Sequence, residues 1–195
     1  MVFQEKTYRV LVVSASEQLD RAITPLLPPT DYYPVDFVRN VAQAQRRLLE
    51  DAYDIVIVNA PLPDDFGMKL AIHTCGSSSA GVLLLVKNEL YNEVYAKVVP
   101  YGVLTLSKPT NTQMIAQSLR VLCATRERLR QMEEKQITVE KKIQEIRLVN
   151  RAKWLLIQCL TMTEEDAHHY IEKQAMDLRL SKQEVAENII KTYGG

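Results

Sequence analysis

The groups best placed to do chemistry in this chain are polar side chains that follow apolar runs of strand length. The run at residues 54–58 ends on the amide of Asn59, an earlier run ends on Ser14 and Ala15, and a later one is followed by Lys108. An amide is not an anionic nucleophile, so Asn59 cannot accept a phosphoryl group. A hydroxyl and a methyl group supply too little negative charge to offset the dehydration of Mg²⁺, so Ser14 and Ala15 predict no magnesium site.

Other reactive residue types are poorly arranged for catalysis or metal binding. The three cysteines are widely spaced without a CxxC pair, and Cys75 has no identifiable base partner. The adjacent His168 and His169 would point about 100° apart on a helix, which makes a poor chelate. Asp64 and Asp65 follow prolines and are typical of a solvated turn. No phosphate-binding glycine loop occurs in the sequence, so we expect neither an enzyme nor a metal or cofactor site.

Five short apolar runs and the helix-like stretches between them would position these groups. Continuous apolar runs are typical of strands covered on both faces, as in a parallel sheet. The sequence therefore predicts a doubly wound α/β domain with a five-stranded parallel sheet over residues 1–120. The predicted strands are residues 8–14, 34–40, 53–59, 81–87 and 103–107, and the predicted helices between them are residues 17–23, 41–50, 66–74 and 89–99.

A long helix is predicted after the α/β domain. Residues 110–160 contain no Gly or Pro, and TNTQ at residues 110–113 has the pattern of a capping box. Apolar residues recur at coiled-coil spacing, and Gln136 and Asn150 at a positions favour a two-stranded coil, in which they pair across the axis. We therefore expect residues 121–150 to form a homodimer, the alternative being one amphipathic helix folded back on its own domain. The predicted dimer seam consists of Leu122, Leu129, Met132, Gln136, Val139, Ile143, Ile146 and Asn150.

Residues 151–195 predict a small helical module. Thr163 precedes three acidic residues, which a helix dipole favours at a helix N-terminus, and Ser181 with Glu184 forms a capping box. The two helices that begin there are too short to be stable alone, so they must pack on the end of the long helix. Together with that end they make a three-helix module.

The overall charge excludes indiscriminate binding of polyanions. The 195 residues contain 24 Lys and Arg against 24 Asp and Glu, so the formal net charge is zero and any nucleic-acid contact must come from a local patch. No stretch approaches the ~20 apolar residues of a membrane span, and the first residues lack a long apolar run. We expect a cytoplasmic protein with no membrane partner.

The last segment, RAKWLLIQCLTMTEEDAHHYIEKQAMDLRLSKQEVAENII, resembles the ANTAR module, an RNA-binding domain of bacterial transcription antiterminators. Trp154 departs from the small residue that is common in the family at this position. The resemblance implies an RNA target, namely paired small hairpins with hexanucleotide loops, whose capture prevents formation of a terminator stem. The matching residues are Ala152, Lys153, Leu156, Gln158, the Thr163 helix start, Gln174 to Asp177, Arg179 and Glu184 to Ala186.

The first 120 residues resemble a response-regulator receiver domain, through the strand pattern, the Lys108-Pro pair and Gly102 before the last strand. The resemblance implies a degenerate phosphorylation site. Ser14 and Ala15 stand where receivers have an acidic pair, Asn59 stands at the phosphoacceptor, and Lys108 alone is retained. We therefore expect control without receiver phosphorylation, through a regulatory protein or small ligand at the N-terminal domain, or through protein abundance.

RNA recognition needs cations for phosphates and groups that stack on, or hydrogen-bond to, unpaired bases. For each predicted cation, an ordinary position as a solvated side chain on a helix surface explains the residue as well as RNA contact does. Two other functions stay open, a coiled-coil interaction adaptor that binds no nucleic acid, and DNA binding through the last two helices. The predicted RNA-binding residues are Arg147, Arg151, Lys153, Tyr170, Lys173, Gln174, Arg179 and Lys182.

Overall fold

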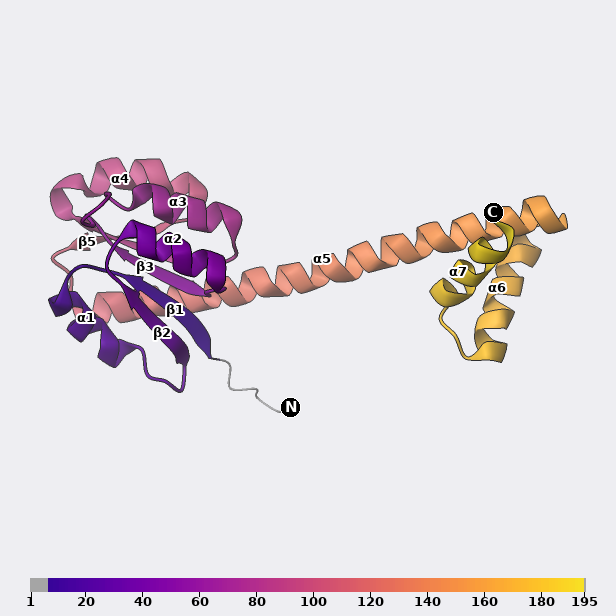
Figure 1. Ribbon diagram of the computed structural model, residues 1–195, viewed down its shortest axis with the longest axis horizontal. Coiled ribbons are helices and arrows are strands. Elements are labelled where there is room, and N and C mark those ends of the chain that lie inside the picture. The colour runs from indigo at the N-terminus through magenta and orange to yellow at the C-terminus, as the bar shows by residue number, and fades with distance from the viewer. Residues whose placement is uncertain (1–6, 195) are drawn as a thin grey trace. The chain divides into compact units, whose positions relative to one another are not determined.

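The computed structural model describes residues 7–194. The chain divides into two compact units, Met1–Gln131 and Met132–Gly195. A sheet and its covering helices make up the first unit, and helices alone make up the second (Figure 1). One helix, α5 (Thr112–Leu160), contributes to both units.

The first unit is built on a five-stranded sheet in the order β2-β1-β3-β4-β5, and every neighbouring pair is parallel. This confirms the predicted doubly wound α/β domain. Because the strand order reverses between β1 and β3, the carboxyl ends of these strands border the crevice where such sheets bind ligands. The strands are β1 (Tyr8–Val13), β2 (Tyr32–Val38), β3 (Ile55–Asn59), β4 (Gly81–Lys87) and β5 (Leu104–Lys108).

Helices cover both faces of this sheet (Figure 1). On one face, α1 (Glu17–Ile23) and the start of α5 pack on the strands through Ile23, Ile115 and Leu119. The other face is covered by α2 (Val41–Glu50), α3 (Met68–Ser77) and α4 (Tyr91–Val98). Burial on both faces explains why the central strands are apolar at nearly every position. Three short 3-10 helices, η1 (Thr24–Leu26), η2 (Asn88–Leu90) and η3 (Val99–Tyr101), lie in the connections.

The starts of three helices differ from the sequence prediction. Helix α4 begins at Tyr91, two residues later than predicted, because Asn88–Leu90 form the 3-10 helix η2. Helix α5 begins at Thr112 because Asn111 Oδ1 accepts a hydrogen bond from the Met114 amide at 2.8 Å, so the predicted capping box on Thr110 is wrong by one residue. Helix α3 begins at Met68, two residues later than predicted, because Gly67 adopts a left-handed φ of 92° just before it. The predicted start of α2 is confirmed, with the Asn40 side chain as its cap.

The second unit is a three-helix module formed by the end of α5 with α6 (Glu164–Leu178) and α7 (Lys182–Tyr193), as the sequence predicts. Its core joins Ala152 and Leu156 of α5 to buried residues of α6 and α7 such as Ile171 and Val185. The Thr163 side chain caps α6, and the predicted capping box at the start of α7 is present. These local signals fix where α6 and α7 start, and the apolar stripes then fix how they pack.

Candidate functional site

The predicted degenerate phosphorylation residues meet at the carboxyl ends of β1, β3 and β5. Lys108 Nζ donates to Asn59 Oδ1 at 2.6 Å and to the Ala60 carbonyl at 2.6 Å. Asn59 Nδ2 in turn donates to Ser14 Oγ at 3.2 Å. Ser14 and Asn59 are buried, whereas Ala15 is exposed and brings no polar side-chain atom. The structure therefore joins three of the four residues in one hydrogen-bonded chain.

The charge in this network is carried by Lys108. Burial, together with the nearby Lys87 ammonium, lowers the pKa of Lys108 from its usual value. No carboxylate in residues 7–194 forms an ion pair with this ammonium. An amide at position 59 orients the lysine without neutralising its charge.

The two carboxylates nearest in sequence to Asn59 serve the backbone of neighbouring turns. Asp64 accepts hydrogen bonds from the amides of Val41 and Ala42 at 2.9 and 3.0 Å, and these bonds lower the pKa of Asp64. Asp65 accepts from the Gly67 amide at 2.8 Å. Both acidic groups are therefore used as acceptors at the starts of α2 and α3.

A guanidinium lies beside the end of β1. Arg39, just after β2, donates to the Ser14 carbonyl at 3.1 Å and forms an ion pair with Asp20 of α1. The described residues contain no group of three or more His, Cys, Asp and Glu side chains arranged to hold a metal ion. The charge of Arg39 is thus offset by Asp20, whereas Lys108 has no carboxylate partner among the described residues.

The predicted RNA-binding cations fall into two groups in the second unit. Lys153 pairs with Glu164 at 3.2 Å and Lys182 with Glu172 at 2.7 Å, and the latter hydrogen bond lowers the pKa of Glu172. These two lysines already have intramolecular partners. The remaining four are exposed and make no ion pair within the described part of the chain; they are Arg147, Arg151, Lys173 and Arg179.

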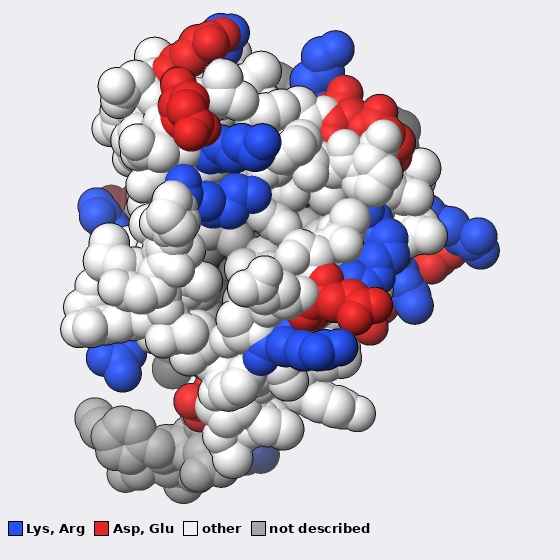
Figure 2. Space-filling view, turned by 90° about the vertical axis from the view of Figure 1, so that its left-hand side faces the viewer, with Lys and Arg blue, Asp and Glu red and all other residues white. Residues whose placement is uncertain are grey.

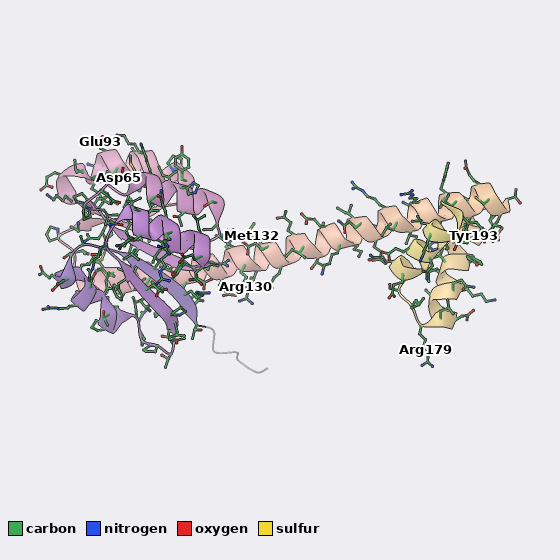
Figure 3. The ribbon with its side chains drawn as sticks, in the orientation of Figure 1. Asp65, Glu93, Arg130, Met132, Arg179 and Tyr193 are labelled. Atoms are coloured by element: carbon green, nitrogen blue, oxygen red, sulfur yellow. The ribbon has the colours of Figure 1, made fainter. Side chains whose placement is uncertain are left out.

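Arg179 has a distinctive position among these four. It ends α6 in a left-handed conformation with φ of 54°, and it projects from the turn between α6 and α7 (Figure 3). A positive φ is uncommon for a residue with a side chain, and here it lets the Arg179 amide bond to the carbonyls of Ala175 and Met176.

Two exposed residues of α5 extend the arginine pair into a stripe that the sequence prediction did not include. Arg147, Arg151, Trp154 and Gln158 follow one another at intervals of four, three and four residues, so they share one face of the helix. Trp154 is 56% exposed, although a tryptophan normally buries most of its surface. The same spacing rule that paired the arginines would have found both residues.

A second polar cluster lines a groove of about 250 Å³ between α6 and α7. Tyr170 and Gln174, which the sequence predicts as base contacts, lie together on its α6 side. Asn188 and Tyr193 line it from α7 and were missed, and Figure 3 shows Tyr193 near the end of that helix. The groove thus combines two phenol rings with two amide side chains.

The predicted dimer seam is exposed along α5 except at its first residue. Leu129, Met132, Val139, Ile143 and Ile146 are between 38% and 57% exposed, and Gln136 and Asn150 are exposed as well. Leu122 is instead buried in the core of the first unit. Leu122 therefore cannot belong to a seam between subunits, and any such seam begins at Leu129.

Three further groups were considered from the sequence. Burial raises the pKa of the Cys75 thiol to about 11, so it stays protonated and unreactive near neutral pH. His168 and His169 both approach Glu172 on the surface of α6, at 3.3 and 3.8 Å. Within residues 7–194, no helix combines the length and apolar character needed to cross a membrane.

Comparisons with known proteins agree with this architecture. The ANTAR domain model matches residues 138–190. The transcriptional regulatory protein PdtaR of Mycobacterium tuberculosis is 26% identical over 141 residues, which cover 72% of this chain and 69% of PdtaR.

Solved structures resemble the first part of the chain. The signal receiver domain of an HD domain-containing protein from Pseudomonas fluorescens has a TM-score of 0.59 and 25% identity, over 67% of this chain and 96% of that one. A CheY-like response regulator receiver domain protein from Methanospirillum hungatei has a TM-score of 0.57 and 14% identity, over 63% and 98% of the two chains. A structure named adenylate cyclase, from Rhodopirellula baltica, has a TM-score of 0.59 at 18% identity, over 66% and 96%, and shows the fold alone. The chain therefore carries an ANTAR domain at residues 138–190 behind an α/β domain with the receiver fold.

Proposed function

We propose that the protein binds RNA through its C-terminal module and regulates transcription antitermination by capturing paired hairpins in leader RNA. The observation that carries the proposal is the exposed stripe of Arg147, Arg151, Trp154 and Gln158 within the residues matched by the ANTAR model. The arginines supply phosphate contacts, the indole supplies a stacking platform and the amide reads a base edge.

The division of labour along the chain is part of the same proposal. Residues 1–128 form the receiver-like platform, residues 129–150 a coiled coil that holds a homodimer, and residues 151–195 the module that contacts RNA. Two modules on one dimer engage two hairpins of one RNA, so avidity exceeds the affinity of either contact alone. The exposed apolar seam from Leu129 to Asn150 supports dimerisation. Apolar side chains at a and d positions are stabilised when they pack against the same positions of a second helix.

A binding assay with three nucleic acids tests RNA binding directly. The full chain is titrated with a two-hairpin leader RNA, a scrambled RNA of the same composition and duplex DNA, each across a range of salt concentrations. We expect the two-hairpin RNA to bind most tightly, with affinity that falls as salt rises because condensed counterions are released. Equal weak binding to all three would favour the interaction adaptor, and preference for the duplex would favour DNA binding.

Arg147→Ala combined with Arg151→Ala is expected to weaken binding of the two-hairpin RNA and to flatten its salt dependence. Removing one cation from a phosphate reduces the slope of log affinity against log salt by roughly 0.7–0.9. The matched control is Lys191→Ala, which removes an exposed cation of α7 outside both candidate clusters. A slope that stays unchanged in the double variant would indicate that Lys173 and Arg179, not the two arginines of α5, contact the phosphates.

We further propose that the receiver-like domain acts without phosphorylation. Incubation with a small-molecule phosphodonor and Mg²⁺ is expected to leave the intact mass unchanged. Asn59 is a neutral amide, and its oxygen already accepts a hydrogen bond from Lys108. Asn59→Asp alone is not expected to restore labelling, since Ser14 and Ala15 provide no acidic pair for the metal. A base-labile adduct on the native protein would contradict this proposal and would point to Asp64 or Asp65.

A further inference from the structure

The ammonium of Lys108 is held at the carboxyl edge of the sheet by neutral acceptors only. Its two hydrogen-bond partners are an amide oxygen and a backbone carbonyl, each at 2.6 Å. An ammonium has three donors, so one N–H remains beyond these two bonds. Taking a cation partly out of water without a counter-anion is unfavourable, and the lowered pKa of Lys108 has this cause first.

A cavity of about 380 Å³ opens beside this ammonium. Asn59 and Lys108 form one side of it, and Ser16, Thr110 and Thr112 add hydroxyl groups. The apolar part of the lining comes from α1 and the start of α5, through Leu19, Ala22 and Ile115. Among the described residues that line the cavity, Lys108 alone is charged.

We propose that this cavity binds a small organic monocarboxylate, whose carboxylate is the missing counter-anion of Lys108 and whose apolar body lies against Leu19, Ala22 and Ile115. The ligand makes the charge-assisted hydrogen bond that no side chain of the described chain supplies. Hydroxyl groups of Ser16 and Thr110 satisfy the remaining carboxylate lone pairs.

The lining also decides against other ligand classes. A divalent cation is repelled by Lys108 and finds no carboxylate in the lining. A phosphate dianion needs more positive charge than one ammonium, and part of the cavity lining is apolar.

The face shown in Figure 2, which looks at the end of the first unit, carries basic and acidic side chains dispersed among uncharged ones. Specific local contacts, not a broad field, must therefore select the anion.

The test compares an acid with its uncharged counterpart on the full chain. Benzoate and benzamide are titrated in turn, with inorganic phosphate as a third arm, while backbone NMR signals of Ser16, Leu19, Lys108 and Ile115 are followed. We expect saturable shifts with benzoate and at least about tenfold weaker binding of benzamide, because the amide loses the charge-assisted hydrogen bond to Lys108. We expect no saturation with phosphate, because one ammonium supplies too little positive charge for a dianion. Benzamide that binds as tightly as benzoate, phosphate that saturates first, or a lack of any saturable shift would each overturn the proposal.

Three variants locate the ligand within the cavity. Lys108→Met is expected to lower benzoate affinity about tenfold or more, whereas Lys87→Met, which removes the neighbouring cation that does not line the cavity, is expected to change it less than about threefold. Asn59→Asp supplies a carboxylate within the chain, so it is expected to displace benzoate and raise the pKa of Lys108. Retained benzoate binding in both Lys108→Met and Asn59→Asp would place the ligand elsewhere. The wild-type comparison of acid and amide stands even if one variant folds poorly.

Discussion

Replacing Ile143 and Ile146 with glutamate is expected to produce monomers and to weaken binding of a two-hairpin RNA much more than binding of a single hairpin. Both side chains are exposed on the isolated chain, at 44% and 53%, so the substitutions leave the packing within the subunit intact. In a parallel dimer the exposed halves of the four isoleucines become buried, and losing that burial costs roughly 3–6 kcal/mol per dimer. Sedimentation of the variant measures the mass directly.

A matched control separates the seam from charge in general. Lys141→Glu with Gln144→Glu adds negative charge at exposed positions of the same helix outside the a and d register, so the mass should stay that of a dimer. A monomer can engage only one hairpin at a time, so the seam variant should bind the two-hairpin RNA roughly 10²–10⁴-fold more weakly, while single-hairpin affinity changes little. A seam variant with unchanged mass would show that the subunits associate through another surface.

The sheet could be predicted from the sequence because each of its strands has a strong local signal. The strand that ends at Asn59 is buried at every position, so its apolar run is continuous and its end is sharp. Helix starts at Thr163 and Ser181 were also recognisable, since a cap acts within four residues of the chain. The convergence of Ser14, Asn59 and Lys108 then follows from parallel strand ends meeting at one edge.

The sequence does not reveal contacts where a pattern has two possible partners. Leu122 is in register with the heptads, but it packs on the sheet of its own subunit, and periodicity alone does not say what covers a helix face. Lys153 and Lys182 look like free cations in the sequence, yet their partners Glu164 and Glu172 are eleven and ten residues away, on neighbouring helices. Exposure of Trp154 depends on how three helices pack, which no local spacing specifies.

Trp154→Ala is expected to be the most damaging single change on the proposed RNA face. Stacking of a base on an aromatic ring is worth roughly 1–3 kcal/mol, and the substitution alters both modules of a dimer, so two-hairpin binding should weaken by about 2–6 kcal/mol. Trp154→Phe keeps a ring and should retain most of the affinity. Because Trp154 is 56% exposed, circular dichroism and thermal unfolding should change little.

The salt dependence distinguishes stacking from charge. Trp154→Ala should lower affinity at every salt concentration and leave the slope of log affinity against log salt unchanged, since an indole releases no counterions. Met176→Ala, a change at a side chain of α6 that is 78% exposed, serves as the control for loss of exposed apolar surface and should bind as the wild type does.

Fluorescence gives an independent reading of the same contact, because Trp154 is the single tryptophan of the chain. A base stacked on the indole should quench its emission when the two-hairpin RNA is added, and the scrambled RNA should not. If affinity survives Trp154→Ala and no quenching occurs, bases must be contacted elsewhere. The groove between α6 and α7 then becomes the first candidate, because Tyr170 and Tyr193 line it and can stack on bases in place of Trp154.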